Sequence, residues 1–230
     1  MRHRGYAAAV VRSGTSTQED WFQQGRIGML GGHCSLREYM DRLASELQKL
    51  DEKALDDLSE MIVSAWESGA NVFVCGNGGS AATGSHLAQD LAKGVIRESD
   101  LLDGSMRRIR SISLTANMAW LTALANDLGY ENIFVQQLAN HAQTGDLLIA
   151  ISGSGNSPNI VRAVEWANSH GLITYGMTGF DGGVLKRLQQ NGLHVALNDM
   201  EMVESIHSCV CHWLVDDVRA RIYREGRHAS

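Results

Sequence analysis

Two short segments rich in glycine and serine have the composition of phosphate-binding loops. The first, residues 76–80, reads Gly-Asn-Gly-Gly-Ser, and the second, residues 152–157, reads Ser-Gly-Ser-Gly-Asn-Ser. Glycines let the backbone approach an anion closely, helix starts offer unpaired N–H groups, and serine hydroxyls add hydrogen bonds. Either segment alone could be an ordinary tight turn. Together they predict a phosphate pocket in which Gly78, Gly79 and Gly153 allow close backbone contact.

Four further side chains could form a metal or acid–base site. His86 and Asp90 are four residues apart on the helix predicted after the first segment, so they share one face. Glu204 and His212 are eight residues apart on the last predicted helix, again close to one face. Two imidazoles and two carboxylates suit Zn²⁺. On composition alone, surface hydrogen bonding is the simpler interpretation of the His86–Asp90 pair.

Alternating strands and helices must position these residues. Short apolar runs predict strands at 72–75, 109–114, 147–151, 172–177 and 193–197. Helical patterns predict helices at 52–68, 81–93, 118–126, 131–141, 158–169 and 201–223, and one after Gly182-Gly183. The alternation predicts an α/β three-layer sandwich, in which helices flank both faces of a parallel sheet. Ligands of such sheets bind beyond the carboxyl ends of the strands, where both Gly/Ser segments fall.

Two helices are predicted before the first strand. Ser35 is a plausible N-cap of the first, and Glu38 completes a capping box. The second helix ends at Gly69. Residues 1–34 lack helical or strand periodicity, so we expect a disordered tail there. We expect residues 35–225 to form a single domain.

Bulk composition narrows the class of protein. The chain of 230 residues has a formal net charge of −6 at pH 7 and only a short basic cluster at 107–110, so broad binding of nucleic acid is not indicated. It lacks an apolar run of about 20 residues, which argues against a membrane span. Neither Gly/Ser segment has a nucleotide-loop spacing. The four cysteines fit no disulfide or zinc-finger pattern and indicate reduced thiols in a cytoplasmic protein.

Four motifs resemble the sugar isomerase (SIS) domain family. They are Cys75–Ser80, Ser85–Asp90, Ala125–Asp127 and Ile151–Ser157. Within the family they resemble the phosphoheptose isomerases, which interconvert sedoheptulose 7-phosphate and D-glycero-D-manno-heptose 7-phosphate. This resemblance extends from about residue 35 to 223. It implies a flavodoxin-like SIS fold, metal-assisted aldose–ketose isomerisation of a phosphorylated seven-carbon sugar through an enediolate, and a homotetramer with active sites at subunit contacts.

The resemblance also suggests which residues bind the substrate. The positions that would hold the phosphate are Ser80, Ser152, Ser154 and Ser157. Asn77 would line the sugar. Asp127 would contact substrate hydroxyls or cap a helix, and the residues favour neither alternative. Glu204 is a further candidate substrate contact.

A zinc site is implied in the same way. Members of the family that bind zinc use a His and a Glu on the first helix of the site and a Gln and a His on the last. The matching positions here are His86, Asp90, Glu204 and His212, which would hold one Zn²⁺ per subunit. Two of the four therefore differ from the family pattern. Asp90 has a shorter reach than Glu, and Glu204 adds a negative charge that should favour a cation.

The implied base and acid are Asp90 and His212. Isomerisation moves a proton between adjacent carbons, so it needs both groups and a means of steadying the negative oxygens. Glu201 matches a further carboxylate of the family and could assist. A carboxylate bound tightly to zinc is a poor free base. Either the metal is displaced during turnover, or Glu201 or Glu204 is the base.

Two other functions compete with an enzyme. Some SIS proteins bind the bacterial replication initiator and lack the metal residues, so the presence of His86 and His212 counts against that function. Others sense sugar phosphates but carry a separate DNA-binding domain. Residues 1–34 are too short and too irregular for such a domain.

Overall fold

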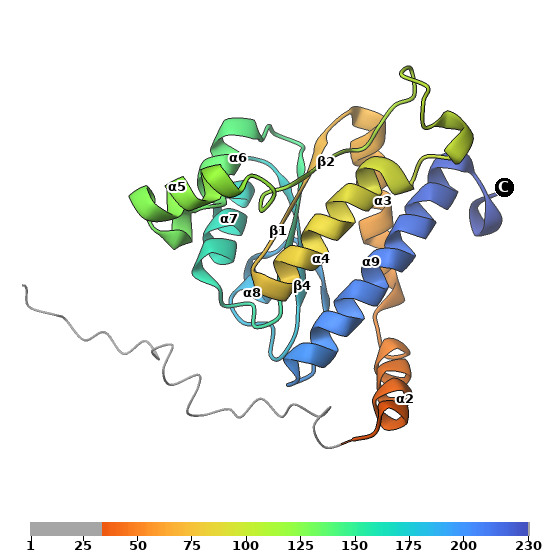
Figure 1. Ribbon diagram of the computed structural model, residues 1–230, viewed down its shortest axis with the longest axis horizontal. Helices are drawn as coiled ribbons and strands as arrows, with labels where there is room; N and C mark the ends of the chain where they lie inside the picture. The colour runs from red at the N-terminus through yellow and green to blue at the C-terminus, as the bar shows by residue number, and fades with distance from the viewer. Residues whose placement is uncertain (1–33, 230) are drawn as a thin grey trace, which may run out of the picture.

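A five-stranded parallel sheet forms the centre of the computed structural model, which describes residues 34–229 (Figure 1). The strand order is β2-β1-β3-β4-β5. The bounds are Asn71–Gly76 for β1, Arg110–Ser113 for β2, Leu147–Ser152 for β3, Ile173–Thr178 for β4 and Asn191–His194 for β5. Connections leave in opposite directions from β1 and β3, which are neighbours, and this creates a switch point at their carboxyl ends.

Helices cover both faces of this sheet. One face carries α3 (Glu52–Ser68), α4 (Gly78–Gln89) and α9 (Met200–Tyr223). The other carries α5 (Met118–Leu128), α6 (Val135–His141), α7 (Pro158–Ser169) and α8 (Leu185–Leu188). Strand side chains alternate between faces, so Val72 and Val74 join the first apolar cluster whereas Phe73 and Cys75 join the second. The predicted three-layer α/β sandwich is confirmed.

The two predicted leading helices are also present. In α2 (Leu36–Leu47), the Ser35 hydroxyl accepts from the Glu38 N–H and the Glu38 carboxylate accepts from the Ser35 N–H, which is the expected capping box. Helix α3 ends at Gly69, whose φ of 77° is left-handed. Helix α2 packs against the start of α9 and extends beyond the sheet (Figure 1), and none of its residues is fully buried.

Several element boundaries differ from the prediction, among them the helix predicted at 131–141, which begins at Val135 after a 3₁₀ turn. The helix after β1 begins at Gly78 rather than 81, and its end continues into a π-helical turn at Asp90–Gly94. The prediction missed this start because glycines are poor helix formers. The last strand is Asn191–His194 rather than 193–197. It is an edge strand, so pairing with β4 rather than burial sets its position, and its polar start gave no apolar signal.

Short helices complete the described chain. Three 3₁₀ turns span Glu98–Asp100, Tyr130–Asn132 and Gly226–His228. In the part of the chain that the structure describes, no helix combines the length and apolar character of a membrane span. Except for Cys34, the tail predicted at 1–34 lies outside the described residues.

Candidate functional site

Both Gly/Ser segments lie at the switch point. Gly76, at the end of β1, pairs in register with Ile151, near the end of β3. The two segments therefore start side by side, and the helices that follow them leave toward opposite faces of the sheet. Gly78 and Gly79 are exposed at the first turn of α4. The region between these two helix N-termini, which we call the crevice, is the usual ligand position in this class of sheet.

The two helices at the crevice lack a side-chain cap, as do the short helices α6 and α8. Asn77 is the N-cap of α4 and Ser157 is the N-cap of α7, yet neither side chain accepts a hydrogen bond from its own helix. In contrast, α2, α3, α5 and α9 are capped by the side chains of Ser35, Asp51, Asn117 and Asp199. The first N–H groups of α4 consequently keep their capacity to bind an anion. In α7, Pro158 has no N–H and the Ile160 N–H is bonded to Ser157 and Asn159, so the Asn159 N–H is the group that remains there.

The Asn77 side chain forms its hydrogen bonds with residues outside α4. Its Nδ2 donates to Asn159 Oδ1 and its Oδ1 accepts from Asn159 Nδ2, both at 2.9 Å. The Tyr130 hydroxyl also donates to Asn77 Oδ1 at 2.9 Å. Sequence reasoning missed Asn159 and Tyr130. The only local signal was their position beside predicted motifs, because each contacts Asn77 from a distant part of the chain.

The second segment is held in a defined loop. Ser152 Oγ accepts from the Gly155 N–H, and Ser154 Oγ accepts from the Asn156 N–H. Asn156 donates to the Ser154 carbonyl and accepts from the N–H of residue 184. A serine hydroxyl that accepts one bond can still donate its own proton. Ser152 and Ser154 can therefore still donate to a phosphate oxygen.

The remaining predicted phosphate contacts lie around the crevice. Ser80 is buried in the first turn of α4. Gly153 lies against the Met200 sulfur, and Gly79 lies against the Glu204 carboxylate. The first turns of α9 therefore cover part of the crevice. A side chain at either glycine would have to displace an α9 residue.

Three of the predicted metal ligands lie together beside the end of α4. His86, Asp90 and His212 each offer one ligand atom, and these atoms lie within 4.8 Å of one another. His86 Nε2 is 3.2 Å from Asp90 Oδ2, and the two imidazoles pack edge to face with 5.0 Å between centroids. Metal–ligand bonds of about 2.1 Å place tetrahedral ligands roughly 3.4 Å apart, so a small rotation of the side chains would close the group.

This donor set fits a catalytic metal. Two imidazoles and one carboxylate leave a coordination position free for a ligand. His86 and His212 are exposed and Asp90 is half-buried, so the ion would be reachable from solvent. The three residues line a cavity of 210 Å³ together with Ala82, Thr83, Leu87, Ser208 and Cys211. Zn²⁺ and Fe²⁺ both use such sets.

Glu204 does not belong to this metal group. Glu204 and His212 are eight positions apart, which amounts to about 12 Å of helix rise, so a shared helix face does not bring them together. Glu204 instead lies at the first turn of α4, against Gly79. Burial, with a smaller contribution from the Glu201 carboxylate, raises the pKa of Glu204. Glu201 itself is exposed in the first turn of α9.

Asp127 and His207 lie on α5 and α9, respectively. Asp127 is exposed near the end of α5 and accepts a bond from the Asn126 side chain, so it is not an N-cap. His207 is buried in α9, and neither ring nitrogen has a hydrogen-bond partner among the described residues. Burial lowers the pKa of His207 to about 4. His207 is therefore a neutral core residue at pH 7.

Comparison with known proteins identifies the family. The family model described as SIS domain matches residues 36–179. The chain belongs to the SIS domain family. Among curated SIS relatives, a phosphoheptose isomerase of Citrifermentans bemidjiense is 33% identical over 198 residues, which cover 86% of this chain and 96% of the relative. A phosphoheptose isomerase of Aliarcobacter butzleri is 36% identical over 169 residues, covering 74% and 85%.

Solved SIS structures share the fold. A phosphoheptose isomerase from Neisseria gonorrhoeae matches with a TM-score of 0.72 and 26% identity, over 83% of this chain and 97% of that chain. One from Francisella tularensis matches with a TM-score of 0.70 and 26% identity, over 88% and 98%. The SIS-type arrangement of the sheet and its two leading helices is thus confirmed.

Proposed function

We propose that this chain is a phosphoheptose isomerase that interconverts sedoheptulose 7-phosphate and D-glycero-D-manno-heptose 7-phosphate. One observation carries the proposal: α4 bears both halves of the site. Its first turn opens on the phosphate crevice, and His86 lies about 9 Å further along the helix axis from Ser80. This separation is on the scale of an extended sugar phosphate. Relatives at 33–36% identity that are phosphoheptose isomerases support the same activity.

The phosphate end would be bound by backbone and hydroxyl groups. The first N–H groups of α4 and the Asn159 N–H of α7 would point at the phosphate oxygens. Hydroxyl donors would come from Ser80, Ser152, Ser154 and Ser157. Asn77, Asp127 and Glu204 are the proposed contacts to the sugar.

The reacting end would lie at the metal group. We assign His86, Asp90 and His212 as ligands of one Zn²⁺ per subunit. When bound, the ion would act as a Lewis acid toward the sugar oxygens. Asp90 would take the proton from the carbon beside the carbonyl and return it to the neighbouring carbon, and His212, while not bound to the ion, would pass a proton between the two oxygens. Glu201 and Glu204, the alternative bases if Asp90 stays bound to the ion, lie about 12 Å or more from His212 along the axis of α9, so either would act only if the reacting carbons lay at the first turns of that helix. The raised pKa of Glu204 makes it a stronger base than an exposed glutamate.

A non-catalytic role explains less of the geometry. A protein that only binds the replication initiator needs no converging His86, Asp90 and His212. A sugar-phosphate sensor would use the crevice but not the metal group. The SIS domain of a transcription factor from Sphaerobacter thermophilus matches with a TM-score of 0.57 and 22% identity, which shows the fold alone.

Turnover of the proposed substrate is the direct test. Purified protein is incubated with sedoheptulose 7-phosphate, with and without added Zn²⁺, and the heptose product is followed. We expect turnover that rises with metal loading. Folded protein that forms no product under either condition would rule out this activity.

A further inference from the structure

Asn77 is a residue type that normally caps helices, but its side chain is engaged elsewhere. Its carboxamide forms a reciprocal pair with Asn159 and accepts a third bond from the Tyr130 hydroxyl, all at 2.9 Å. Asparagine at an N-cap ordinarily accepts from the N–H two or three residues later. Asn117 does so at α5, where its Oδ1 accepts from the Trp120 N–H at 3.1 Å. The chemistry of Asn77 therefore permits capping, and its neighbours prevent it.

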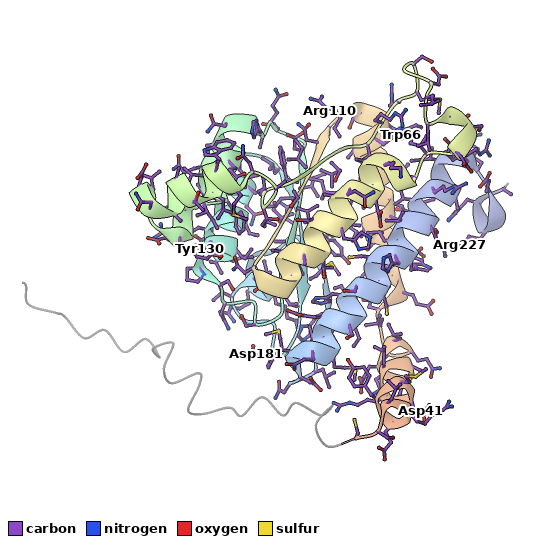
Figure 2. The ribbon with its side chains drawn as sticks, viewed as in Figure 1. Asp41, Trp66, Arg110, Tyr130, Asp181 and Arg227 are labelled. Atoms are coloured by element: carbon purple, nitrogen blue, oxygen red, sulfur yellow. The ribbon has the colours of Figure 1, made fainter. Side chains whose placement is uncertain are left out.

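Asn159 is held in the orientation that this pairing requires. It is 1% exposed in the first turn of α7, and its Oδ1 also accepts from the Ile160 N–H at 3.0 Å. With Oδ1 fixed in this way, its Nδ2 is directed toward Asn77 Oδ1. Tyr130 approaches from the turn after α5, on the side of the sheet opposite α9 (Figure 2). Its ring is half exposed, so its hydroxyl bond to Asn77 closes the open side of the pair.

We propose that Asn159, assisted by Tyr130, is a positioning residue that keeps Asn77 from capping α4 and so reserves the first N–H groups of that helix for the substrate phosphate. This inference rests on the proposed function. Without Asn159, the Asn77 carboxamide would turn toward the N–H groups of Gly79 or Ser80. A phosphate would then have to displace it.

The probe for this proposal is inorganic phosphate, whose dissociation constant is measured by calorimetry on the full chain. We expect Asn159→Ala to weaken phosphate binding about fivefold, which is the equilibrium weight of one N-cap hydrogen bond. Tyr130→Phe removes one of the two bonds to Asn77 Oδ1 and should weaken binding less, by about twofold. The matched control is Asn168→Ala at the far end of α7, where the side chain bonds to residues 174, 188 and 190.

A double variant separates competition from simple support of the loops. In Asn77→Ala/Asn159→Ala no carboxamide remains to cap α4, so phosphate affinity should recover from the level of Asn159→Ala to that of Asn77→Ala. If the double variant binds no better than Asn159→Ala, the pair only holds the loops together and the proposal is overturned.

The remaining outcomes distinguish this inference from the proposed function. If the unmodified chain binds phosphate and Asn159→Ala binds it equally well, only this inference is overturned. Failure of the unmodified chain to bind phosphate overturns the anchor of the proposed function as well. If Asn159→Ala does not fold, Tyr130→Phe decides the matter, because its side chain is half exposed and unchanged affinity would contradict the proposal.

Discussion

At the scale of single residues, the metal group offers the clearest test. Its three ligand atoms converge from two helices, so the loss of one should leave a site too weak to hold an ion. We expect His86→Ala and His212→Ala to bind Zn²⁺ at least tenfold more weakly than the unmodified chain. Metal content after dialysis against a weak chelator measures this. His141→Ala is the control, since His141 lies on α6, outside the group.

Unchanged zinc in His86→Ala would show that the ligand set is wrong. A Glu204→Gln variant tests whether Glu204 is a metal ligand, because the structure places Glu204 outside the group. It should retain zinc even if its turnover changes. Loss of zinc from Glu204→Gln would instead return Glu204 to the ligand set.

His207 should make stability depend on pH. Its pKa is about 4 in the folded chain, whereas an ordinary histidine has a pKa of about 6.5. Between these values the unfolded chain binds a proton that the folded chain does not, so stability falls as pH decreases. The difference between these two pKa values corresponds to roughly 3 kcal/mol of unfolding free energy between pH 7 and pH 4. Urea unfolding at several pH values measures this loss.

A side chain at position 207 that does not titrate should remove most of this dependence of stability on pH. His207→Gln keeps a neutral polar group in the core, and we expect its stability to change less between pH 7 and pH 4. His141→Gln, at an exposed position, should keep the slope of the unmodified chain. Identical pH profiles for His207→Gln and the unmodified chain would contradict the assignment of His207 as a neutral core residue.

At the scale of elements, the loop between β3 and α7 depends on one glycine. Gly155 has a φ of 66°, and a Cβ there would collide with the backbone carbonyl of Gly182. Gly145 has a φ of 91° but open space around it. Gly145→Ala should therefore cost about 1 kcal/mol for its backbone conformation alone. Gly155→Ala should lower the free energy of unfolding by about 3 kcal/mol, because it combines the strained backbone conformation with overpacking against Gly182.

Denaturant unfolding at fixed protein concentration compares the two variants. A folded Gly155→Ala protein should also bind phosphate more weakly, because the loop must shift to relieve the collision. Equal costs for the two substitutions would mean that the contact between Gly155 and Gly182 does not constrain the loop.

At the scale of the whole molecule, a buried aspartate fastens the end of the chain to α9. Asp217 accepts from Arg221 at 2.7 Å and from Arg227 and His228 at 2.8 Å each. Arg227 also reaches Asp56 on α3 and lies beside the C-terminal part of α9 (Figure 2). Burial alone would raise the pKa of Asp217, but these hydrogen bonds outweigh it and lower the pKa.

Replacement of this aspartate should weaken the fold in a pH-dependent way. We expect Asp217→Asn to lower the free energy of unfolding at pH 7 by about 2 kcal/mol, less than for a fully buried pair because Arg227 is half exposed. Because the pKa of Asp217 is lower in the folded chain than in the unfolded chain, its carboxylate stabilises the fold above the unfolded pKa of about 3.9. This contribution is lost as the pH falls toward the folded pKa. Urea unfolding should therefore show the difference narrowing below pH 4. An equal difference at pH 7 and pH 3 would contradict the ionic role.

The whole molecule also carries a surface that is suited to assembly. Apolar side chains remain exposed on α2 and α9, among them Leu36, Met40 and Trp213. A groove of 480 Å³ between the leading helices and α9 is lined largely by apolar residues. We expect a homotetramer of 25.1 kDa subunits by sedimentation. Met40→Glu should shift it to smaller species, whereas Leu102→Glu, in an exposed loop, should not. A monomeric unmodified chain would contradict the tetramer.

The sequence alone determined the features that depend on neighbours along the chain. Strand and helix periodicity predicted the layered sheet, and the capping box at Ser35 predicted the start of α2. The Gly/Ser segments predicted a crevice at two helix starts. The spacing of His86 and Asp90 predicted their shared face. Each of these follows from interactions within a few residues, which local patterns encode.

Only the tertiary structure decided which distant residues meet. Asn77 and Asn159 are 82 residues apart, and their pairing depends on β1 and β3 being neighbours in the sheet. Glu204 and His212 share a helix face, but the rise of α9 separates them, so only His212 reaches the metal group. Strand order and the placement of α9 arise from packing of the whole core, which short-range sequence patterns do not encode.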